Sequence, residues 1–284
     1  MKWCSKLVVP ALLFALSQTA VISAHAETKL TKLLPQSIRD SGTLRVIASP
    51  NSPPMIYAGK DARTLEGMEI DLTQAVADAL GVKLDVTSGT FDSLIPSIAA
   101  GRADIAVGSI GDLKARQAQV DFVDYVKAGV GMAALKGNGA GIKGLASLCG
   151  KKVAAVRGTF QERELSAQQS KCQAAGSTLE VQTFTDASGA VLALRSGRAD
   201  VWSGDTAQVA YAVKQFPNVL EQVGDLRIIA LLGYAVGKQN TQLRDAVKSA
   251  LDELKADGKY RQILDKWGQG DTRADTISIN DAWL

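Results

Sequence analysis

Histidine and cysteine are scarce in this chain of 284 residues, which contains one His and three Cys. The single histidine, His25, lies in an N-terminal stretch that we expect to be removed, so the mature protein would carry no imidazole. The lack of imidazole excludes a Ser-His-Asp or Cys-His catalytic centre and every His-ligated metal site. We therefore expect neither a metal site nor a cofactor.

An excess of charge of one sign is also missing, since 32 Lys and Arg oppose 29 Asp and Glu without a dense basic cluster. This balance argues against binding to nucleic acid or to an anionic membrane surface. Beyond the N-terminus, no apolar run reaches the roughly 18–20 residues that span a bilayer. Hydrophobic residues make up 46% of the chain, which is too many for a disordered protein and enough for a core that does not depend on cross-links.

Residues 1–26 have the pattern of a secretory signal. Two lysines precede an apolar stretch at 7–16, and Ala24-His25-Ala26 forms a small-x-small cleavage site. An uncleaved anchor is the alternative, but the short apolar stretch and the good cleavage site favour removal. Cys4 precedes the apolar stretch and cannot be a lipid-modified residue at the cleavage point. We expect an exported protein of the Gram-negative periplasm.

Cys149 and Cys172 are the only thiols left after export, and an even count in an oxidising compartment favours a disulfide between them. The pattern between them predicts a strand over 151–156 and a helix over 161–170. The bond would tie the entry of this strand to the exit of this helix. Two buried free thiols are the alternative.

Short β-branched runs alternate with helical patterns, which predicts an α/β protein with mostly parallel sheets. The expected strands are 44–48, 84–87 and 105–107, and the expected helices are 69–80, 92–100, 113–120 and a C-terminal one around 243–257.

An internal repeat divides the chain into two similar halves. Gly101-Arg102-Ala103-Asp104 recurs 96 residues later as Gly197-Arg198-Ala199-Asp200, each copy between a helical pattern and a short apolar strand. Eight residues after each Gly lie Ser109 and Asp205. Because ligands of open α/β sheets bind at the carboxyl ends of the strands, these two residues are candidate ligand contacts.

Two such halves predict a hinged clamp. We expect the chain to cross between them near 129–134 and 231–235, two Gly-containing apolar segments suited to extended hinge strands. The expected division is a first lobe from 27–133, a second lobe from 134–231, and a return to the first lobe with a C-terminal tail over 232–284. The tail carries Ile277, Ile279 and Trp283, which we expect to pack on the first lobe.

Several motifs together resemble one protein family, by their order and spacing more than by any single match. The motifs are Gly67-Met68-Glu69-Ile70-Asp71-Leu72, Phe91-Asp92-Ser93-Leu94-Ile95-Pro96-Ser97, residues 101–104, Arg116, Val120-Asp121-Phe122, Arg157-Gly158-Thr159 and Lys266-Trp267-Gly268. Over about residues 40–268 the chain resembles the family 3 extracellular solute-binding proteins, the polar amino-acid receptors of ABC importers. The resemblance implies a two-lobed periplasmic-binding-protein type II fold, with two hinge strands, that closes on its ligand.

The resemblance also implies how an α-carboxylate would be held. Arg116 matches the arginine that grips this group, and a guanidinium fork suits the task because it donates two parallel charge-assisted bonds. Ser109 and the backbone at Gly111 match further donors. Thr159 and the backbone of Phe160 match a second-lobe loop that touches the same carboxylate. Without the resemblance, Arg116 would be an ordinary surface residue of a helix.

The remaining site residues concern the ammonium and the side chain of a ligand. Asp205 matches the acid that pairs with the α-ammonium, although it also suits a helix cap. Phe91 matches an aromatic wall of the side-chain pocket, or else is a core residue. Ser52 stands where the family often has an aromatic clamp, and Tyr57 is the candidate to replace it. Arg157, at a strand end, would favour an acidic or amide side chain, or else is a solvated surface residue.

Two departures from the family pattern bear on the ligand. Gly111 lacks the hydroxyl that a Ser or Thr often supplies there, and Ser49 stands where receptors for basic amino acids carry an acid. The second departure argues weakly against Lys or Arg as ligand.

The sequence thus predicts a monomeric, non-catalytic receptor that delivers a polar amino acid or a related solute to an inner-membrane ABC permease. The alternatives are a periplasmic dehydratase acting on prephenate or arogenate on the same scaffold, and a sensor component that presents its ligand to a membrane receptor.

Overall fold

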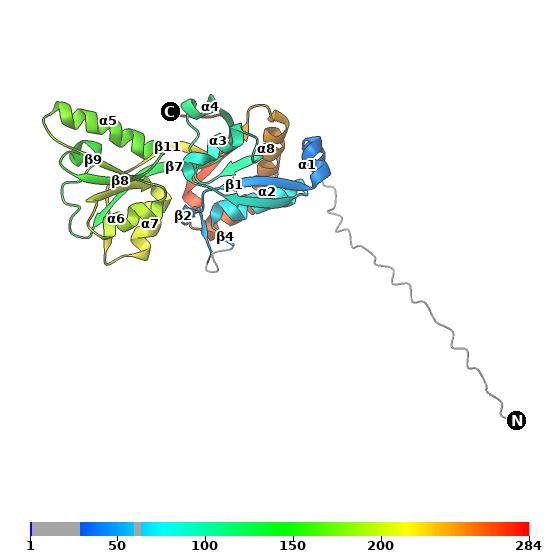
Figure 1. The fold of residues 1–284 in the computed structure, drawn as a ribbon, viewed down its shortest axis with the longest axis horizontal. Coiled ribbons are helices and arrows are strands. Elements are labelled where there is room, and N and C mark those ends of the chain that lie inside the picture. Colours follow the sequence, from blue (N-terminus) through cyan, green and yellow to red (C-terminus); the bar gives the residue numbers. More distant parts are fainter. Residues whose placement is uncertain (2–28, 60–63, 284) are drawn as a thin grey trace.

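Two α/β lobes lie side by side in the computed structural model, which describes Met1 and residues 29–59 and 64–283 (Figure 1). Apart from Met1, the expected secretory signal lies outside the described residues. In the described part of the chain, no helix has the length and apolar character needed to span a membrane.

The first lobe is built on three parallel strands. β1 (Thr43–Ala48) lies between β5 (Lys83–Ser88) and β6 (Ile105–Val107), parallel to both. The helices of this lobe are α2 (Met68–Leu80), α3 (Leu94–Ala99), α8 (Thr241–Ala256) and α9 (Lys259–Lys266). The apolar faces of α2, α8 and α9 join the strands in one core that includes Leu44, Leu72, Tyr125, Leu251 and Leu264.

The second lobe repeats this plan. β8 (Lys152–Val156) lies between β10 (Val201–Asp205) and β9 (Glu180–Phe184), again parallel to both. Its helices are α5 (Phe160–Ala174), α6 (Ala187–Arg195) and α7 (Thr206–Gln215). Because successive strand residues point to opposite faces, Val201 joins a core with Leu165 and Cys172, whereas Trp202 joins a separate core with Leu194 and Val209.

Two long antiparallel strands run through both lobes: β7 (Val120–Leu135) and β11 (Leu220–Gly237). In the first lobe β11 pairs with β6, and in the second lobe β7 pairs with β10. These strands join the parallel strands of the two lobes into one continuous sheet. A Cβ at Gly129 would collide with the carbonyl oxygen of Arg227, so this glycine permits the close approach of β7 and β11 between the lobes.

The predicted repeat occupies equivalent places in the two lobes. Gly101 and Gly197 both adopt a left-handed turn, with φ of 67° and 72°. The carboxylate of Asp104 accepts a hydrogen bond from the backbone N–H of Arg45 in β1 at 2.8 Å, and that of Asp200 from Lys152 in β8 at 2.7 Å. Each repeat therefore ties the start of one parallel strand to its neighbour.

The remaining elements are short. They are α1 (Gln36–Ser41), α4 (Lys114–Gln117), β12 (Arg273–Ile279), a small sheet of β2 (Asn51–Ser52), β3 (Ile56–Ala58) and β4 (Leu65–Glu66), and 3₁₀ helices over Thr31–Leu33, Phe91–Ser93, Leu145–Leu148 and Gly270–Thr272.

Two local predictions differ from the structure. The helix expected over 113–120 is only α4, because β7 already begins at Val120. The helix expected over 92–100 is the 3₁₀ turn Phe91–Ser93 followed by α3. In the tail, β12 pairs with β7 and buries Ile277, whereas Trp283 remains 46% exposed and is covered only in part.

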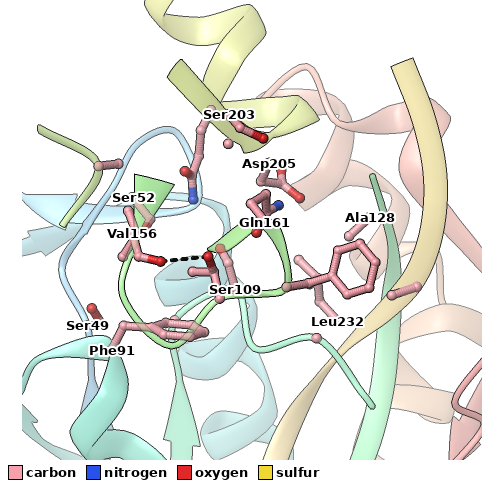
Figure 2. Close-up of a pocket in the computed structure, with 18 of the residues that line it drawn as sticks. Ser49, Ser52, Phe91, Ser109, Ala128, Val156, Gln161, Ser203, Asp205 and Leu232 are labelled. Atoms are coloured by element: carbon pink, nitrogen blue, oxygen red, sulfur yellow. Dashed lines mark hydrogen bonds between the residues drawn. The ribbon is translucent and has the colours of Figure 1, made fainter. Parts of the chain in front are cut away.

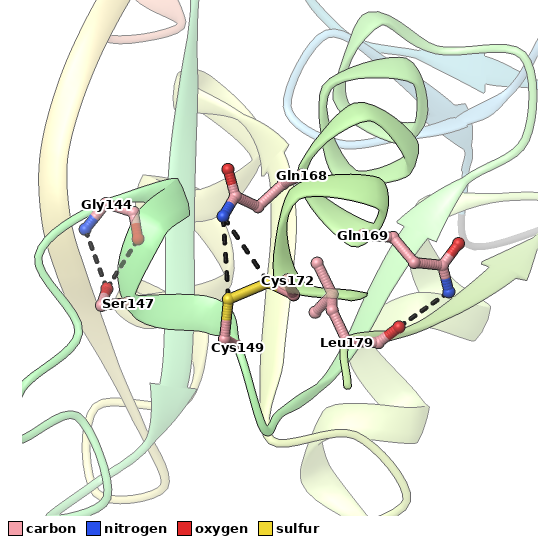
Figure 3. The surroundings of a disulfide bond; sticks show 7 residues. All are labelled: Gly144, Ser147, Cys149, Gln168, Gln169, Cys172 and Leu179. Atoms are coloured by element: carbon pink, nitrogen blue, oxygen red, sulfur yellow. Dashed lines mark hydrogen bonds between the residues drawn. A yellow bond between two sulfur atoms is a disulfide. The ribbon is translucent and has the colours of Figure 1, made fainter. Parts of the chain in front are cut away.

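The disulfide between Cys149 and Cys172 is present, with their Cα atoms 5.5 Å apart (Figure 3). It joins Cys149, three residues before β8, to the last turn of α5, which confirms the predicted tie between strand entry and helix exit. The side-chain nitrogen of Gln168 lies 3.6 Å from the sulfur of Cys172 and 3.8 Å from that of Cys149.

Candidate functional site

A cavity lies between the lobes, where the carboxyl ends of the parallel strands face one another (Figure 2). Its volume, measured out to its open mouth, is about 720 Å³, within the range of pockets for small molecules. In Figure 2, Ser49, Phe91 and Ser109 lie on one side, Ser203 and Asp205 lie on the other, and Gln161 lies between Ser109 and Asp205. The crossing strands contribute Ala128, Gly129, Ile229, Ala230 and Leu232 to its wall.

Arg116 reaches this cavity from the short helix α4, and only 9% of the residue is exposed. Its guanidinium donates to the carbonyl oxygen of Gly111 in its own lobe and to that of Gly158 in the other lobe, both at 2.8 Å. It also lies 5.4 Å from the centre of the Phe91 ring. Burial lowers the pKa of Arg116 to about 10, and the charge of Arg163 acts in the same direction.

Ser109 is held in place by a buried acid that the sequence did not single out. The residue has a φ of 55°, and its backbone N–H donates to both carboxylate oxygens of Glu69 at 2.9 Å. Glu69 is fully buried at the start of α2 and also accepts a hydrogen bond from the hydroxyl of Tyr125. The hydroxyl of Ser109 is buried without a partner among the described residues. Ser109 lines the cavity, so this hydroxyl lies beside a ligand bound there.

Asp205 faces the cavity from the end of β10 and caps α7, accepting a hydrogen bond from the N–H of Ala207 at 2.9 Å. Burial raises the pKa of Asp205 to about 6, against the lowering effect of backbone N–H donors from Ala207, Gly129 and Gln208. Burial likewise raises the pKa of Glu69 to about 7, and the charge of Asp205 adds to this rise.

The charged groups around this cavity lack partners of opposite sign. Within residues 29–59 and 64–283, no ion pair involves Arg116, Asp205 or Glu69. Hydrogen bonds of the described residues use two of the five guanidinium donors of Arg116, which leaves three for a ligand. A buried charge without a partner is costly, so the cavity is suited to a molecule that carries both an anionic and a cationic group.

Most of the predicted site residues come together here. Arg116, Asp205, Ser109, Gly111, Phe91, Thr159, Phe160 and Ser52 all line the cavity. Arg157 is exposed and does not line the cavity. Its backbone N–H donates to the carbonyl oxygen of Phe184, the last residue of β9. Tyr57 does not replace the missing aromatic clamp, because its ring packs edge-on against Trp267, with the ring centres 6.2 Å apart.

Several lining residues were not predicted, namely Gln161, Thr185, Asp186, Ser203 and Gln208. Gln161, Thr185, Asp186 and Gln208 follow the carboxyl ends of β8, β9 and β10, and Ser203 lies within β10, so the same strand-end rule that selected Asp205 could have found them. Asp186 caps α6 through the N–H of Gly189 at 2.8 Å. Ser203 has a buried hydroxyl without a partner among the residues that the structure describes. In that same part of the chain, no group of three or more His, Cys, Asp or Glu side chains is arranged to hold a metal ion.

Comparisons with known proteins agree with this geometry. The profile of the bacterial extracellular solute-binding proteins, family 3, matches residues 44–270. The arginine-binding protein ArgT of Corynebacterium glutamicum is 28% identical over 255 residues, which cover 89% of this chain and 83% of that protein.

Two solved structures are similar over most of their length. An ancestral arginine-binding protein bound to arginine is 35% identical, with a TM-score of 0.75, over 80% of this chain and 98% of that one. The ancestral amino acid-binding protein AncCDT-1, a precursor of cyclohexadienyl dehydratase, is 30% identical, with a TM-score of 0.74, over 81% of this chain and 97% of that one. The two-lobed α/β fold predicted from the sequence is thereby confirmed.

Proposed function

Because this chain belongs to the bacterial extracellular solute-binding proteins of family 3, we propose that it binds a polar α-amino acid, or a related solute, between its lobes and delivers it to an ABC importer. One observation carries the proposal. Within the described residues, a buried guanidinium without a carboxylate partner, that of Arg116, and a carboxylate without a cationic partner, that of Asp205, face the same cavity from different lobes. The α-carboxylate and α-ammonium of an amino acid supply the two missing partners.

The α-carboxylate is assigned to Arg116. The hydroxyl of Ser109 and the backbone N–H of Gly111 lie around the same cavity as further donors. Thr159 and Phe160 form the N-terminus of α5, where unpaired N–H groups and the helix dipole favour an anion. The hydroxyl of Thr159 is itself occupied, since it donates to the carbonyl oxygen of Val156 at 2.6 Å.

The α-ammonium is assigned to Asp205, with Glu69 as a second negative charge behind it. Asp205 raises the pKa of Glu69, which indicates that the two carboxyls lie close enough to repel each other. A bound ammonium group relieves that repulsion. It also lowers the cost of ionising both acids.

The ligand side chain is assigned to the part of the cavity lined by Ser49, Ser52, Gln161 and Phe91. These groups are neutral, so they favour a polar side chain that forms hydrogen bonds over one that needs a carboxylate partner. Arginine is named as ligand for two of the similar proteins above, and it is one candidate to test here.

Binding is proposed to close the lobes by rotation about β7 and β11. In this proposal the lobes are 27–133 with 232–284, and 134–231. Arg116 and Asp205 belong to different lobes, so one ligand contacts both only when the lobes are closed, and its differential affinity favours that state.

Catalysis is not part of the proposal, although AncCDT-1 is described as a precursor of a dehydratase. A dehydratase needs a carboxyl that is free to protonate a leaving group. The two carboxyls that line this cavity, Asp205 and Asp186, both accept hydrogen bonds from helix N–H groups. Turnover of prephenate or arogenate by the purified protein would contradict this part of the proposal.

We also propose that the protein is a periplasmic monomer that hands its ligand to an inner-membrane permease rather than to a sensor. Fractionation of cells that express the full chain should place the protein, shortened after Ala26, in the periplasm. Loss of amino-acid uptake on deletion of its gene would distinguish transport from sensing.

The direct test is thermal unfolding of the mature protein, refolded to remove carried-over ligand, against L-amino acids, opines and small carboxylates. A ligand at 100 times its Kd adds about 2.7 kcal/mol, which raises the Tm by several degrees in a protein of this size. A rise confined to a few amino acids supports the proposal, and no rise with any amino acid contradicts it.

A further inference from the structure

A second hollow lies on the second lobe, between α6 and α7. It measures about 640 Å³ out to its open side and is lined mainly by apolar and aromatic residues, among them Val191, Leu192, Trp202, Tyr211 and Phe216. We call it the α6–α7 groove. Leu192 is 55% exposed there, although most large hydrophobic residues of the described chain are buried. An exposed apolar groove of this size is typical of a binding site.

The α6–α7 groove adjoins the ligand cavity. Ala187 and Gln208, at the starts of α6 and α7, line both spaces. On the first lobe, Ser52 lines the cavity and its neighbour Pro53 lines the groove. On the first lobe, the two spaces therefore come together at the small side chain of Ser52. A ligand that occupied both spaces would cross between them at this point.

Polar groups without partners lie at the junction. Trp202 is 1% exposed, and its indole N–H is buried without a hydrogen-bond partner among the described residues. The indole lies against the cavity wall, because a Cβ at Gly204 would lie 3.1 Å from Nε1 of Trp202. Gln208 is 9% exposed, and none of the hydrogen bonds formed by the described residues involves its side-chain amide. A buried N–H without a partner is destabilising, so this junction favours a ligand with a carbonyl or amide at this depth.

We propose that the α6–α7 groove holds the far end of the ligand, and that the ligand class is α-amino acids whose side chain continues through an amide into an apolar group. This inference rests on the proposed function, since Arg116 and Asp205 hold the amino-acid end. The amide lies at Gln208 and Trp202, and the apolar group packs on Tyr211 and Phe216. γ-Glutamyl conjugates of apolar amino acids have this form. Their terminal carboxylate would point toward Arg195, whose guanidinium lies 3.9 Å from the centre of the Phe216 ring.

Isothermal titration of the refolded mature protein with L-glutamine and with γ-L-glutamyl-L-phenylalanine tests the inference. The two probes share the amino-acid end and the amide, and only the second reaches the groove. We expect the conjugate to bind at least tenfold more tightly than glutamine. Tyr211→Ala should remove most of that advantage and leave the Kd for glutamine within about twofold. Val213→Ala, on the same helix but outside both spaces, is the matched control and should change neither Kd.

Leu192→Glu provides a second variant at an exposed position, where a change does not threaten folding. It should weaken the conjugate tenfold and leave glutamine unaffected. Equal binding of the two probes by the wild type, or loss of both probes together in these variants, would overturn the groove assignment. Binding of free amino acids would then still support the proposed function, whereas absence of binding by any amino acid or conjugate would overturn both proposals.

Discussion

Replacing Arg116 by alanine is the sharpest test of how the ligand is held. The guanidinium is buried and has no carboxylate partner within the described residues, so the ligand carboxylate would lose its principal counter-charge. Removing one partner of a buried, hydrogen-bonded charge pair costs about 2–5 kcal/mol. At 1.4 kcal/mol per factor of ten, this corresponds to a Kd raised by about 30- to 4,000-fold. Arg116→Lys keeps the positive charge, and its Kd should lie between that of the wild type and that of Arg116→Ala. A lysine cannot donate the parallel pair of bonds that a guanidinium donates.

A comparison of L-arginine with agmatine, which lacks the α-carboxylate, separates this contact from general damage to the site. If L-arginine binds the wild type, Arg116→Ala should weaken it by the factor above and change the weaker binding of agmatine by less than about threefold. The measurement is isothermal titration of both ligands against both proteins. Arg157→Ala, which removes an exposed arginine outside the cavity, is the matched control and should leave both affinities unchanged. Equal losses for the two ligands would refute the assignment of the carboxylate to Arg116.

Four further predictions concern the acids and the disulfide. Asp205→Asn should weaken an amino acid at least tenfold but spare its des-amino analogue, measured by titration with both; equal losses would remove Asp205 from the ammonium contact. Affinity for an amino acid should fall about tenfold between pH 7 and pH 5, because protonation of Asp205, with a pKa of about 6, removes the charge that attracts the ammonium group. Glu69, with a pKa of about 7, should begin to lose its charge at a higher pH than Asp205 does. In Glu69→Gln the affinity should therefore not yet fall near pH 7, and an unchanged pH profile in this variant would contradict a role for Glu69. Replacing Cys149 and Cys172 together by serine should cost about 3 kcal/mol and lower the Tm by about 6–12 °C without changing ligand affinity; a Tm within 1 °C of the wild type would contradict this.

The stability of the ligand-free protein should also depend on pH through these two carboxyls, but in the opposite direction to ligand affinity. The pKa of Glu69 and that of Asp205 both lie above the ordinary carboxyl range, so the folded state holds protons more tightly than the unfolded chain. Their contribution to the free energy of unfolding therefore falls as the pH rises from about 4 to about 7. Urea unfolding of the wild type and of Glu69→Gln across this range should show a smaller fall in the variant, and parallel curves would count against the buried acid as its source.

The sequence predicts those parts of the fold that local patterns encode. The strand over 105–107 and the helix over 69–80 follow from apolar periodicity and glycine stops, and the structure has them within one residue. The repeat around Asp104 and Asp200 is also a local signal, since each copy ties together two strands of its own lobe. Local patterns could not predict that α4 has only four residues. The chain is already in β7 at Val120 because it pairs there with β11, which is distant in the sequence.

The candidate site was predicted only in part, for a physical reason. Strand-end position and family motifs identify Arg116 and Asp205, which the structure places around one cavity. Glu69 was missed because its burial arises from tertiary contacts with Tyr125 and with the backbone of Ser109, residues 56 and 40 positions away. The α6–α7 groove was missed because it depends on the packing of two helices around Trp202, which no local pattern records.

The central claim is that the cavity binds both charged ends of an amino acid at once. The most direct measurement is titration of the refolded mature protein with three matched ligands: the best-binding L-amino acid, its decarboxylated amine and its des-amino acid. The account predicts measurable binding of the amino acid and a loss of at least tenfold on removal of either group. Binding of the amine or the des-amino acid as tightly as the parent would contradict it, because Arg116 or Asp205 would then lack the partner assigned to it.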